Sequence, residues 1–346
     1  MRLFRSPFEQ INLFLPVVLL SASLFEYFSG FRKLWEYENI MKYVQDLIFF
    51  NGLHVCLTFI FLFMTRTGFR VTKEFYSTFG KEGFFKILFV FCVTSISFYL
   101  VHVFASSTSL IFILFYVGFT FFRRKHDLGQ SKGLLRIMNL KHSREFPDNN
   151  QSQFFSIIQK LEHILINLFF YSSLVAILAF FNLADFLGDW KSEVFWLSFG
   201  LSLAICFTLS ILAILSPAGL RFWKFIYSFR FYIKILSPFS AISAYAGAAV
   251  HGTEYICVTD KILTSEQKDQ NLRIRFSEIL YLILTVFIVF SFFRFPELYV
   301  DAISETNTAA IISVAVGIIF SHYYVDYLIF TPKHQFAKPL LKILSK

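Results

Sequence analysis

Long apolar stretches, separated by short charged segments, recur along almost the whole chain. The apolar core of a bilayer is about 30 Å thick, and about 20 helical residues cross it with every backbone polar group bonded internally. Eight stretches are predicted as spans, at about 11–28, 47–64, 85–104, 110–122, 163–181, 195–215, 279–293 and 309–330. The sequence therefore predicts an all-α fold, a polytopic transmembrane helical bundle of about eight or nine spans, in a single domain over residues 1–346.

The ninth span depends on how the segment Ser237 to Val258 is interpreted. This segment is apolar and rich in small residues, contains Pro238 and Gly247, and ends in His251 and Glu254. If it crosses the membrane, the distribution of basic residues places the C-terminal tail outside. If it is re-entrant or interfacial, the tail lies inside. The second interpretation is favoured, because irregular backbone at membrane depth usually lines a cavity.

The charged residues indicate which ends of the spans face the cytoplasm. Lys and Arg concentrate in Arg123–Gln153 and in the tail after Phe330, whereas acids dominate Asp185–Glu193 and Glu297–Glu305. Cytoplasmic loops carry an excess of Lys and Arg. We therefore expect a multi-pass protein of a cytoplasmic-type membrane, with a basic cytoplasmic loop at about 123–153 and a cytoplasmic C-terminal tail. A second basic segment, Arg221–Arg230, is predicted as a link between spans.

The net charge of +9 does not indicate a nucleic-acid partner in this chain. Its basic residues lie in short segments beside apolar runs, where they are expected to face anionic lipid. Membrane lipids and a hydrophobic small-molecule substrate are the expected partners. The four cysteines form no CxxC pair, so they are interpreted as small buried apolar residues rather than zinc ligands.

Histidines inside or beside apolar segments are the first candidates for chemistry, because an ionisable side chain at hydrocarbon depth is costly. Each could instead make a structural hydrogen bond between helices. His126 follows the predicted span at 110–122, and Gln130 shares its face if the helix continues. Four histidines are candidate metal ligands: His54, His126, His251 and His322.

Two of these histidines are followed by an acid at helical spacing. Glu254 and Tyr255 lie three and four residues after His251, and Asp326 lies four residues after His322. Imidazoles with one or two carboxylates suit iron, manganese or zinc, and iron is expected if the substrate is an unactivated lipid chain. Glu254, Asp326 and Tyr255 are the candidate catalytic residues, and the two acids could also orient a ligating imidazole.

This arrangement of isolated histidines on separate helices resembles the bacterial membrane β-carotene 15,15′-dioxygenase family, whose histidines gather around one iron. The distribution of His54, His126, His251 and His322 and the length of the chain carry the resemblance, whereas the H-x-x-E-Y and H-Y-x-x-D segments are too short to match a family signature. It implies a multi-span fold and iron. Membrane fatty-acid desaturases and hydroxylases are also polytopic iron proteins, but their H-x-x-x-H and H-x-x-H-H boxes are absent from this sequence.

The function expected from the sequence is therefore a membrane-embedded, histidine-ligated metalloenzyme with non-haem iron that acts oxidatively on a lipid or isoprenoid. Two other functions are compatible with the same residues. A proton-coupled transporter could use a broken segment such as Ser237 to Val258 as its substrate site and relay protons through His and Asp. A lipid-binding membrane protein would need no catalysis.

Overall fold

The computed structural model of the chain describes residues 7–29, 66–104, 110–145, 153–180, 185–236 and 305–330, together with residues 55, 58, 239, 243, 246, 250–252 and 254. This part of the chain is almost wholly helical and contains no strand. The described residues confirm the predicted all-α class.

Four of the described helices are long and apolar enough to cross a membrane, as expected of an integral membrane protein. α1 (Pro7–Ser29) has a shorter apolar stretch, Leu13–Ser29. The predicted span at 279–293, and that at 47–64 apart from residues 55 and 58, lie outside the described residues. The four long apolar stretches are Gly68–Phe104 of α3 (Arg66–Phe104), all of α5 (Gln153–Phe180), Gly188–Leu215 of η3 (Asp185–Trp190) and α6 (Lys191–Leu215), and Ala309–Leu328 of α11 (Glu305–Phe330).

The chain divides into two compact units. Unit 1 comprises residues 1–36 and 113–250, and it holds α1, nearly all of α4 (Leu110–Glu145), α5, α6 and α7 (Ala218–Leu236). Unit 2 comprises residues 37–112 and 251–344, and it holds α3 and α11.

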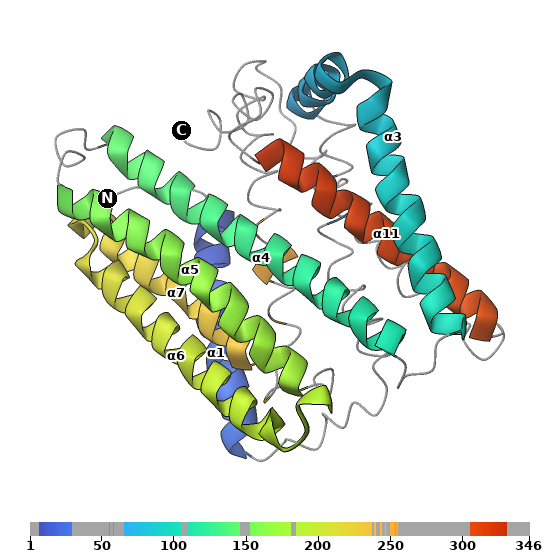
Figure 1. Cartoon of the computed structure of the whole chain (residues 1–346). Helices are drawn as coiled ribbons and strands as arrows, with labels where there is room; N and C mark the ends of the chain where they lie inside the picture. The colour runs from blue at the N-terminus through green and yellow to red at the C-terminus, as the bar shows by residue number, and fades with distance from the viewer. Residues whose placement is uncertain are drawn as a thin grey trace. The chain divides into compact units, whose positions relative to one another are not determined.

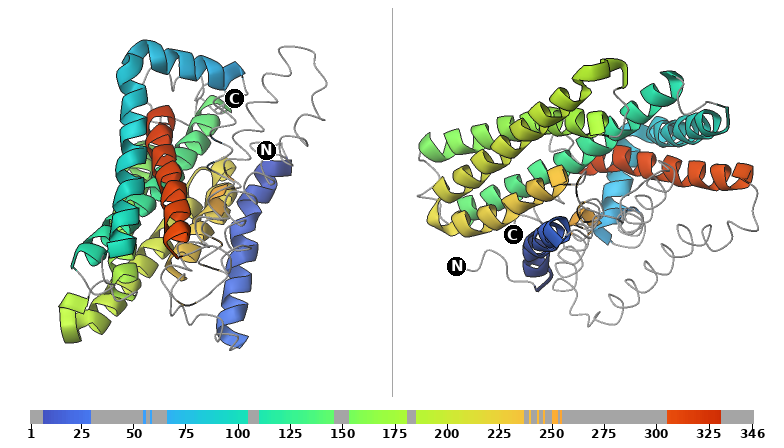
Figure 2. Two further views of the ribbon diagram at one scale, coloured as in Figure 1. Left: turned by 90° about the vertical axis from the view of Figure 1, so that its right-hand side faces the viewer. Right: turned by 90° about the horizontal axis from the view of Figure 1, so that it is seen from below.

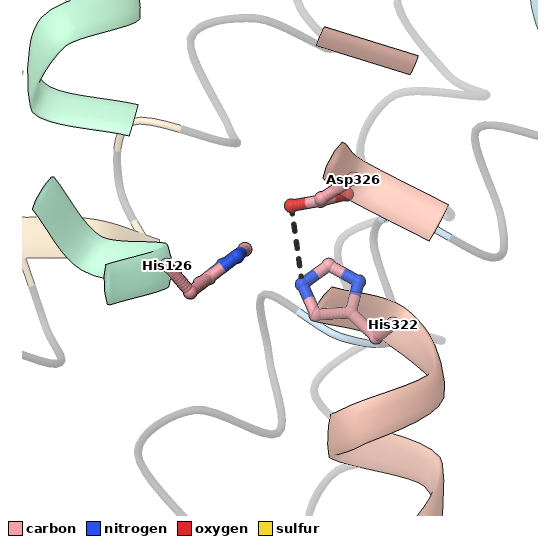
Figure 3. Close-up of side chains that lie close together, drawn as sticks. All are labelled: His126, His322 and Asp326. Atoms are coloured by element: carbon pink, nitrogen blue, oxygen red, sulfur yellow. Dashed lines mark ion pairs between the residues drawn. The ribbon is translucent and has the colours of Figure 1, made fainter. Parts of the chain in front are cut away.

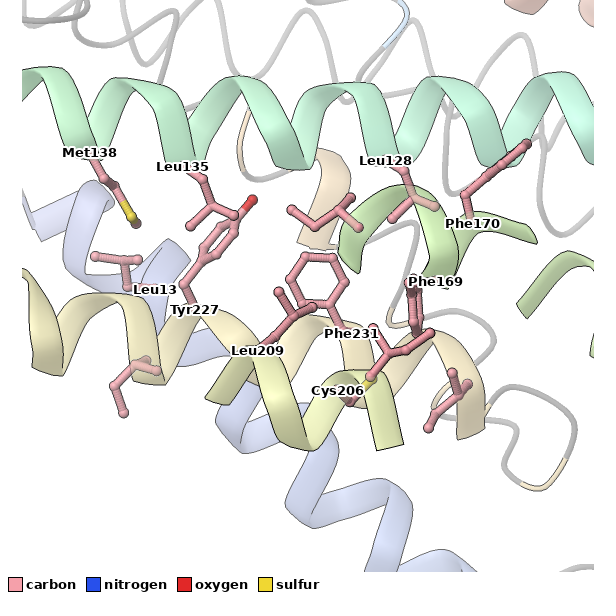
Figure 4. Packing of buried hydrophobic residues seen from close by; sticks show 14 of the residues in the cluster. Leu13, Leu128, Leu135, Met138, Phe169, Phe170, Cys206, Leu209, Tyr227 and Phe231 are labelled. Atoms are coloured by element: carbon pink, nitrogen blue, oxygen red, sulfur yellow. The ribbon is translucent and has the colours of Figure 1, made fainter. Parts of the chain in front are cut away.

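In unit 1, the helices pack side by side around an apolar core (Figures 1 and 2). α5 packs against α6, α6 against α7, and α7 against α1. Phe169 of α5 and Phe231 of α7 meet edge to face, with ring centroids 5.4 Å apart. Figure 4 shows the core between these helices, to which α4 contributes Leu128, Leu135 and Met138, and α6 contributes Cys206 and Leu209.

Two basic segments that flank predicted spans are helical. α4 continues without a break through Arg123 to Glu145. Its buried Leu128, Leu135 and Met138 recur at helical spacing and face the unit 1 core, which explains why the helix does not end with its apolar part.

The prediction that Arg221–Arg230 is a link was wrong, because these residues lie inside the 19-residue helix α7. Leu220, Tyr227 and Phe231 of α7 are all buried in the core of unit 1. These apolar residues lie seven and four residues apart, which places them on one helical face, so the segment is a packed helix rather than a surface connection.

In unit 2, α3 bends at Gly80, where φ is 57° and ψ is −148°. This backbone conformation is essentially confined to glycine. Beyond the bend, α3 lies along α11 (Figure 1). At Gly317 of α11 the two helices approach so closely that a Cβ atom would lie 1.9 Å from the Ser95 hydroxyl of α3. Glycine is needed there because any side chain would collide with α3.

Candidate metal centre

The clearest candidate ligands in unit 2 are His322 and Asp326 of α11 (Figure 3). They are one helical turn apart, so both side chains project from the same face. His322 Nε2 lies 3.3 Å from Asp326 Oδ2, and the two side chains are 0% and 3% exposed. An imidazole and a carboxylate are thus held together on a buried face of an apolar helix.

His251 and Glu254 form a second pair of the same kind in unit 2. His251 Nδ1 lies 3.9 Å from Glu254 Oε2, and both side chains are buried. This distance is too long for a hydrogen bond, but the two side chains still face each other from one side of the helix. The predicted helical spacing of the pair is therefore confirmed, although the contact is looser than that in α11.

His126 lies in unit 1, on α4. Its Nε2 lies 3.4 Å from Nε2 of Gln130, which confirms that the two residues share a helical face. Loss of contact with water lowers the pKa of His126 to about 4; Asp127 opposes this shift and Lys234 adds to it. His126 is therefore neutral near pH 7, the form in which imidazole binds a metal.

Within each unit taken by itself, the described site residues come together as pairs. His54 and Tyr255 lie outside the described residues. Within either unit taken alone, the described residues hold no group of three His, Cys, Asp or Glu side chains whose ligand atoms all lie within 4.8 Å of one another. A complete ligand set drawn from His54, His126, His251 and His322 stays a prediction.

A buried ion pair joins α5 to α7 in unit 1. Lys224 Nζ donates hydrogen bonds to both carboxylate oxygens of Glu162, at 2.7 and 2.9 Å, and the two side chains are 1% and 7% exposed. Neither residue is among the site residues predicted from the sequence. The sequence feature that could have predicted the pair is Glu162, an acid inside the apolar stretch of α5, because such an acid requires a cationic partner from another helix.

A second buried polar cluster lies between α4 and α7. Lys234 Nζ is 3.9 Å from Asp127 Oδ2, and the Arg124 guanidinium donates a hydrogen bond of 3.1 Å to the Lys234 carbonyl. Arg230 lies over the ring of Tyr227, 4.5 Å from its centroid, and donates a hydrogen bond to the Tyr227 hydroxyl. These contacts connect the basic half of α4 to the last two turns of α7.

The Tyr227 hydroxyl in turn donates a hydrogen bond of 3.1 Å to the backbone carbonyl of Ser131 on α4. Burial lowers the pKa of Lys234 from about 10.5 to about 7. Asp127 opposes this shift, whereas the nearby guanidinium groups of α4 and α7 add to it.

No family model matches the chain, and no similar protein was found among curated proteins or solved structures. The function is therefore inferred from the residues themselves.

Proposed function

We propose that this chain is a multi-pass membrane metalloenzyme in which the two His–carboxylate pairs of unit 2 contribute to a transition-metal site. The observation that carries the proposal is the His322–Asp326 pair, fully buried in a helix apolar enough to cross the membrane. Ionisable residues at such positions are rare, and they usually mark a functional site.

The distance within the α11 pair fits two neighbouring ligands of one ion. Protein nitrogen and oxygen ligands lie about 2 Å from a metal, so two of them at tetrahedral or octahedral angles are about 3 Å apart. The 3.3 Å between His322 Nε2 and Asp326 Oδ2 is close to that value. Glu254, 3.9 Å from His251, lies close enough to orient a ligating imidazole through its charge, although it makes no hydrogen bond with it.

Iron is the metal we expect, with manganese or zinc as alternatives. A site of imidazoles and carboxylates suits all three ions, and bound iron would supply oxidative chemistry toward an unactivated lipid or isoprenoid chain. His251 and His322 are the proposed ligands, and Asp326, His54 and His126 are further candidates. Glu254, Asp326 and Tyr255 are the residues proposed to assist the reaction.

The membrane arrangement that accompanies this function has eight or nine spans and a cytoplasmic C-terminal tail. It rests on the apolar stretches of the sequence and on the basic residues that flank them. A substrate dissolved in the bilayer would reach a centre at this depth without passing through water.

Metal stoichiometry of the purified full-length protein tests the proposal. His322→Ala should abolish bound metal, and Asp326→Asn should weaken metal binding about 10- to 100-fold if Asp326 orients a ligand. His102→Ala is the matched control, because His102 lies near the end of an apolar helix and its ring stacks on Phe98, 5.9 Å away. The readout is elemental mass spectrometry on detergent-purified proteins with equal thermal stability.

A proton-coupled transporter is the second candidate, and the buried Lys224–Glu162 and His322–Asp326 pairs favour it. Both pairs contain groups that could exchange a proton inside a membrane protein. If the wild-type protein holds no metal after purification without chelator, and anaerobic reconstitution loads none, the metalloenzyme proposal is wrong. Proton uptake by proteoliposomes then becomes the relevant assay.

A further inference from the structure

The bend at Gly80 divides α3 into a short arm, residues 66–79, and a long arm, residues 81–104. A straight helix of its 39 residues would be about 58 Å long, whereas the apolar core of a bilayer is about 30 Å thick. The long arm contains the predicted span at 85–104 and is long enough to cross that core alone. The short arm therefore lies outside the core, and the left view of Figure 2 shows it turned away from the axis of the long arm.

The inside of the bend is apolar and closely packed. Gly83 of the long arm is buried, and a Cβ atom there would lie 2.7 Å from the Phe75 ring and 2.8 Å from Phe79. The two phenyl rings also contact each other, with centroids 5.1 Å apart. Phe75 and Phe79 of the short arm thus point toward the side on which the long arm continues.

Other apolar residues of the short arm extend this face away from the bend. Val71 is buried one turn before Phe75. Phe69 and Tyr76, seven residues apart, lie along one edge of the apolar face and are 64% and 56% exposed. Exposed aromatic rings at the edge of an apolar face are typical of a helix that lies in the membrane interface.

The opposite face of the short arm is polar and basic. Arg70, Lys73 and Ser77 are exposed, and they follow one another at intervals of three and four residues, so they share this face. The short arm is therefore amphipathic, with its apolar face on the inside of the bend and its basic face on the outside.

The exposed charge around the bend is mainly positive. Residues 68–86 present four exposed cations and one exposed acid, while their second acid, Glu74, is half-buried. The exposed set comprises Arg70, Lys73, Lys81, Lys86 and Glu82. The negative potential of an anionic lipid surface attracts basic residues close to it, and each one favours the bound state about fivefold.

We propose that the short arm of α3 lies along the membrane surface and binds anionic lipid headgroups through Arg70 and Lys73. Because the long arm enters the bilayer at the bend, the inside of the bend faces the bilayer. The apolar face then sits at the level of the headgroups, and the long basic side chains reach the lipid phosphates around the helix. The proposal rests on the insertion of the long arm into a membrane and does not depend on the metal centre.

Site-directed spin labelling of the full-length protein in vesicles tests the position of the short arm. Tyr76→Cys and Ser77→Cys, each in a protein without its native cysteines, place a nitroxide on the apolar edge and on the polar face of the same turn. Oxygen, which concentrates in lipid, and a nickel chelate, which stays in water, report the depth of each label. We expect oxygen to relax mainly the Tyr76→Cys label and the nickel chelate mainly the Ser77→Cys label.

The double variant Arg70→Gln/Lys73→Gln tests the contribution of anionic lipid. The Tyr76→Cys label is compared in vesicles of phosphatidylcholine alone and of equal parts of phosphatidylcholine and phosphatidylglycerol. Phosphatidylglycerol should increase its exposure to oxygen, and loss of the two cations should lower the ratio of bound to free short arm roughly 30-fold in the mixed vesicles. Arg136→Gln/Lys160→Gln, the same exchanges at exposed positions of α4 and α5, is the matched control and should change nothing.

Three results would overturn the proposal. Equal access of the nickel chelate to the Tyr76→Cys and Ser77→Cys labels would mean that the short arm lies in water. A Tyr76→Cys label shielded from both reagents would mean that protein, rather than lipid, covers this edge. An identical depth in the two kinds of vesicle, or an equal loss in both double variants, would show that Arg70 and Lys73 bind no anionic headgroup. None of these results bears on metal content, so this proposal and the proposed function fail independently.

Discussion

Lys224 and Glu162 have lost almost all contact with solvent, and each is stabilised mainly by the other. The Lys224 ammonium also lies over the Phe155 ring, 5.5 Å from its centroid. Two charges removed from water depend on each other more strongly than a surface pair does. The pair therefore holds α5 and α7 in one register at the cost of some stability.

We predict that Glu162→Ala lowers the free energy of unfolding by about 3–5 kcal/mol, because it leaves the Lys224 ammonium buried without its carboxylate. The double variant Glu162→Leu/Lys224→Met should be close to the wild type. Unfolding in mixed micelles with a denaturing detergent provides the measurement. Lys160→Met, an exposed change two residues away on α5, should have little effect, and an equal loss there would contradict the explanation.

Lys234 predicts a dependence of stability on pH. Its pKa is about 7 in the folded protein and about 10.5 when exposed, so between these values the unfolded chain binds more protons. The contribution of Lys234 to the free energy of unfolding therefore rises with pH from about 7 to about 10.5. Lys234→Met should flatten this part of the stability profile relative to the wild type.

The matched control for this measurement is Lys125→Met. Lys125 is exposed on α4, so its replacement should leave the slope unchanged. A wild-type profile that is flat from pH 7 to 10, or a slope that persists in Lys234→Met, would show that Lys234 titrates near its ordinary pKa.

At the scale of the helices, the contact between α3 and α11 depends on Gly317. A Cβ atom at this position would lie 1.9 Å from the Ser95 hydroxyl and 3.0 Å from Phe91. We predict that Gly317→Ala destabilises unit 2 by about 1–3 kcal/mol, because the helices must separate to accommodate the methyl group. Close packing at small residues is a main source of helix association in membranes.

Thermal unfolding in detergent checks this prediction, with Gly200→Ala as the control. Gly200 lies in α6, and a Cβ atom there would meet nothing within 4 Å. Alanine favours the helix over glycine, so Gly200→Ala should be neutral or slightly stabilising. If Gly317→Ala behaves in the same way, the contact between α3 and α11 is looser than described.

The apolar stretches located several helices correctly, because hydropathy measures the property that selects a membrane span. The span predicted at 195–215 and α6 end at the same residue, as do the span predicted at 85–104 and α3. α7 was missed, because its cations were interpreted as solvated. Whether a basic residue faces water or a buried carboxylate depends on another helix, and local hydropathy does not contain that information.

The candidate site residues show the same difference between what local sequence predicts and what depends on another helix. The His322–Asp326 and His251–Glu254 pairs followed from helical spacing alone, since neighbours on one helical face must meet. Lys224 and Glu162 are far apart in the sequence, and nothing local indicates their pairing. Contacts within a helix were therefore predictable, and contacts between helices were not.

For the whole molecule, the distribution of charge predicts which segments face the cytoplasm. Cysteines introduced singly into a protein without its native cysteines should distinguish the two sides. Ser143→Cys and Ser345→Cys should react with an impermeant reagent from the cytoplasmic side, because both lie in basic segments. Ser192→Cys, in the first turn of α6 and within the acidic segment Asp185–Glu193, should react from the opposite side.

Spheroplasts and inverted vesicles provide the two orientations for this labelling. Labelling of Ser345→Cys only from the outside would place the tail there, and would favour a complete crossing by Ser237 to Val258. Labelling of Ser143→Cys and Ser192→Cys from the same side would contradict the predicted topology altogether.

The bend at Gly80 has a consequence for where a substrate could react. Ser95 lies about 22 Å along α3 from the bend, and His322 lies about 7.5 Å along α11 from Gly317, which contacts Ser95. His322 is thus held about 15–30 Å along the α3 axis from Gly80. If the bend rests at the membrane surface, helix geometry fixes the depth of the reacting atoms. Such an enzyme would act on carbon atoms at a fixed distance from the lipid headgroup, whatever the length of the chain beyond them.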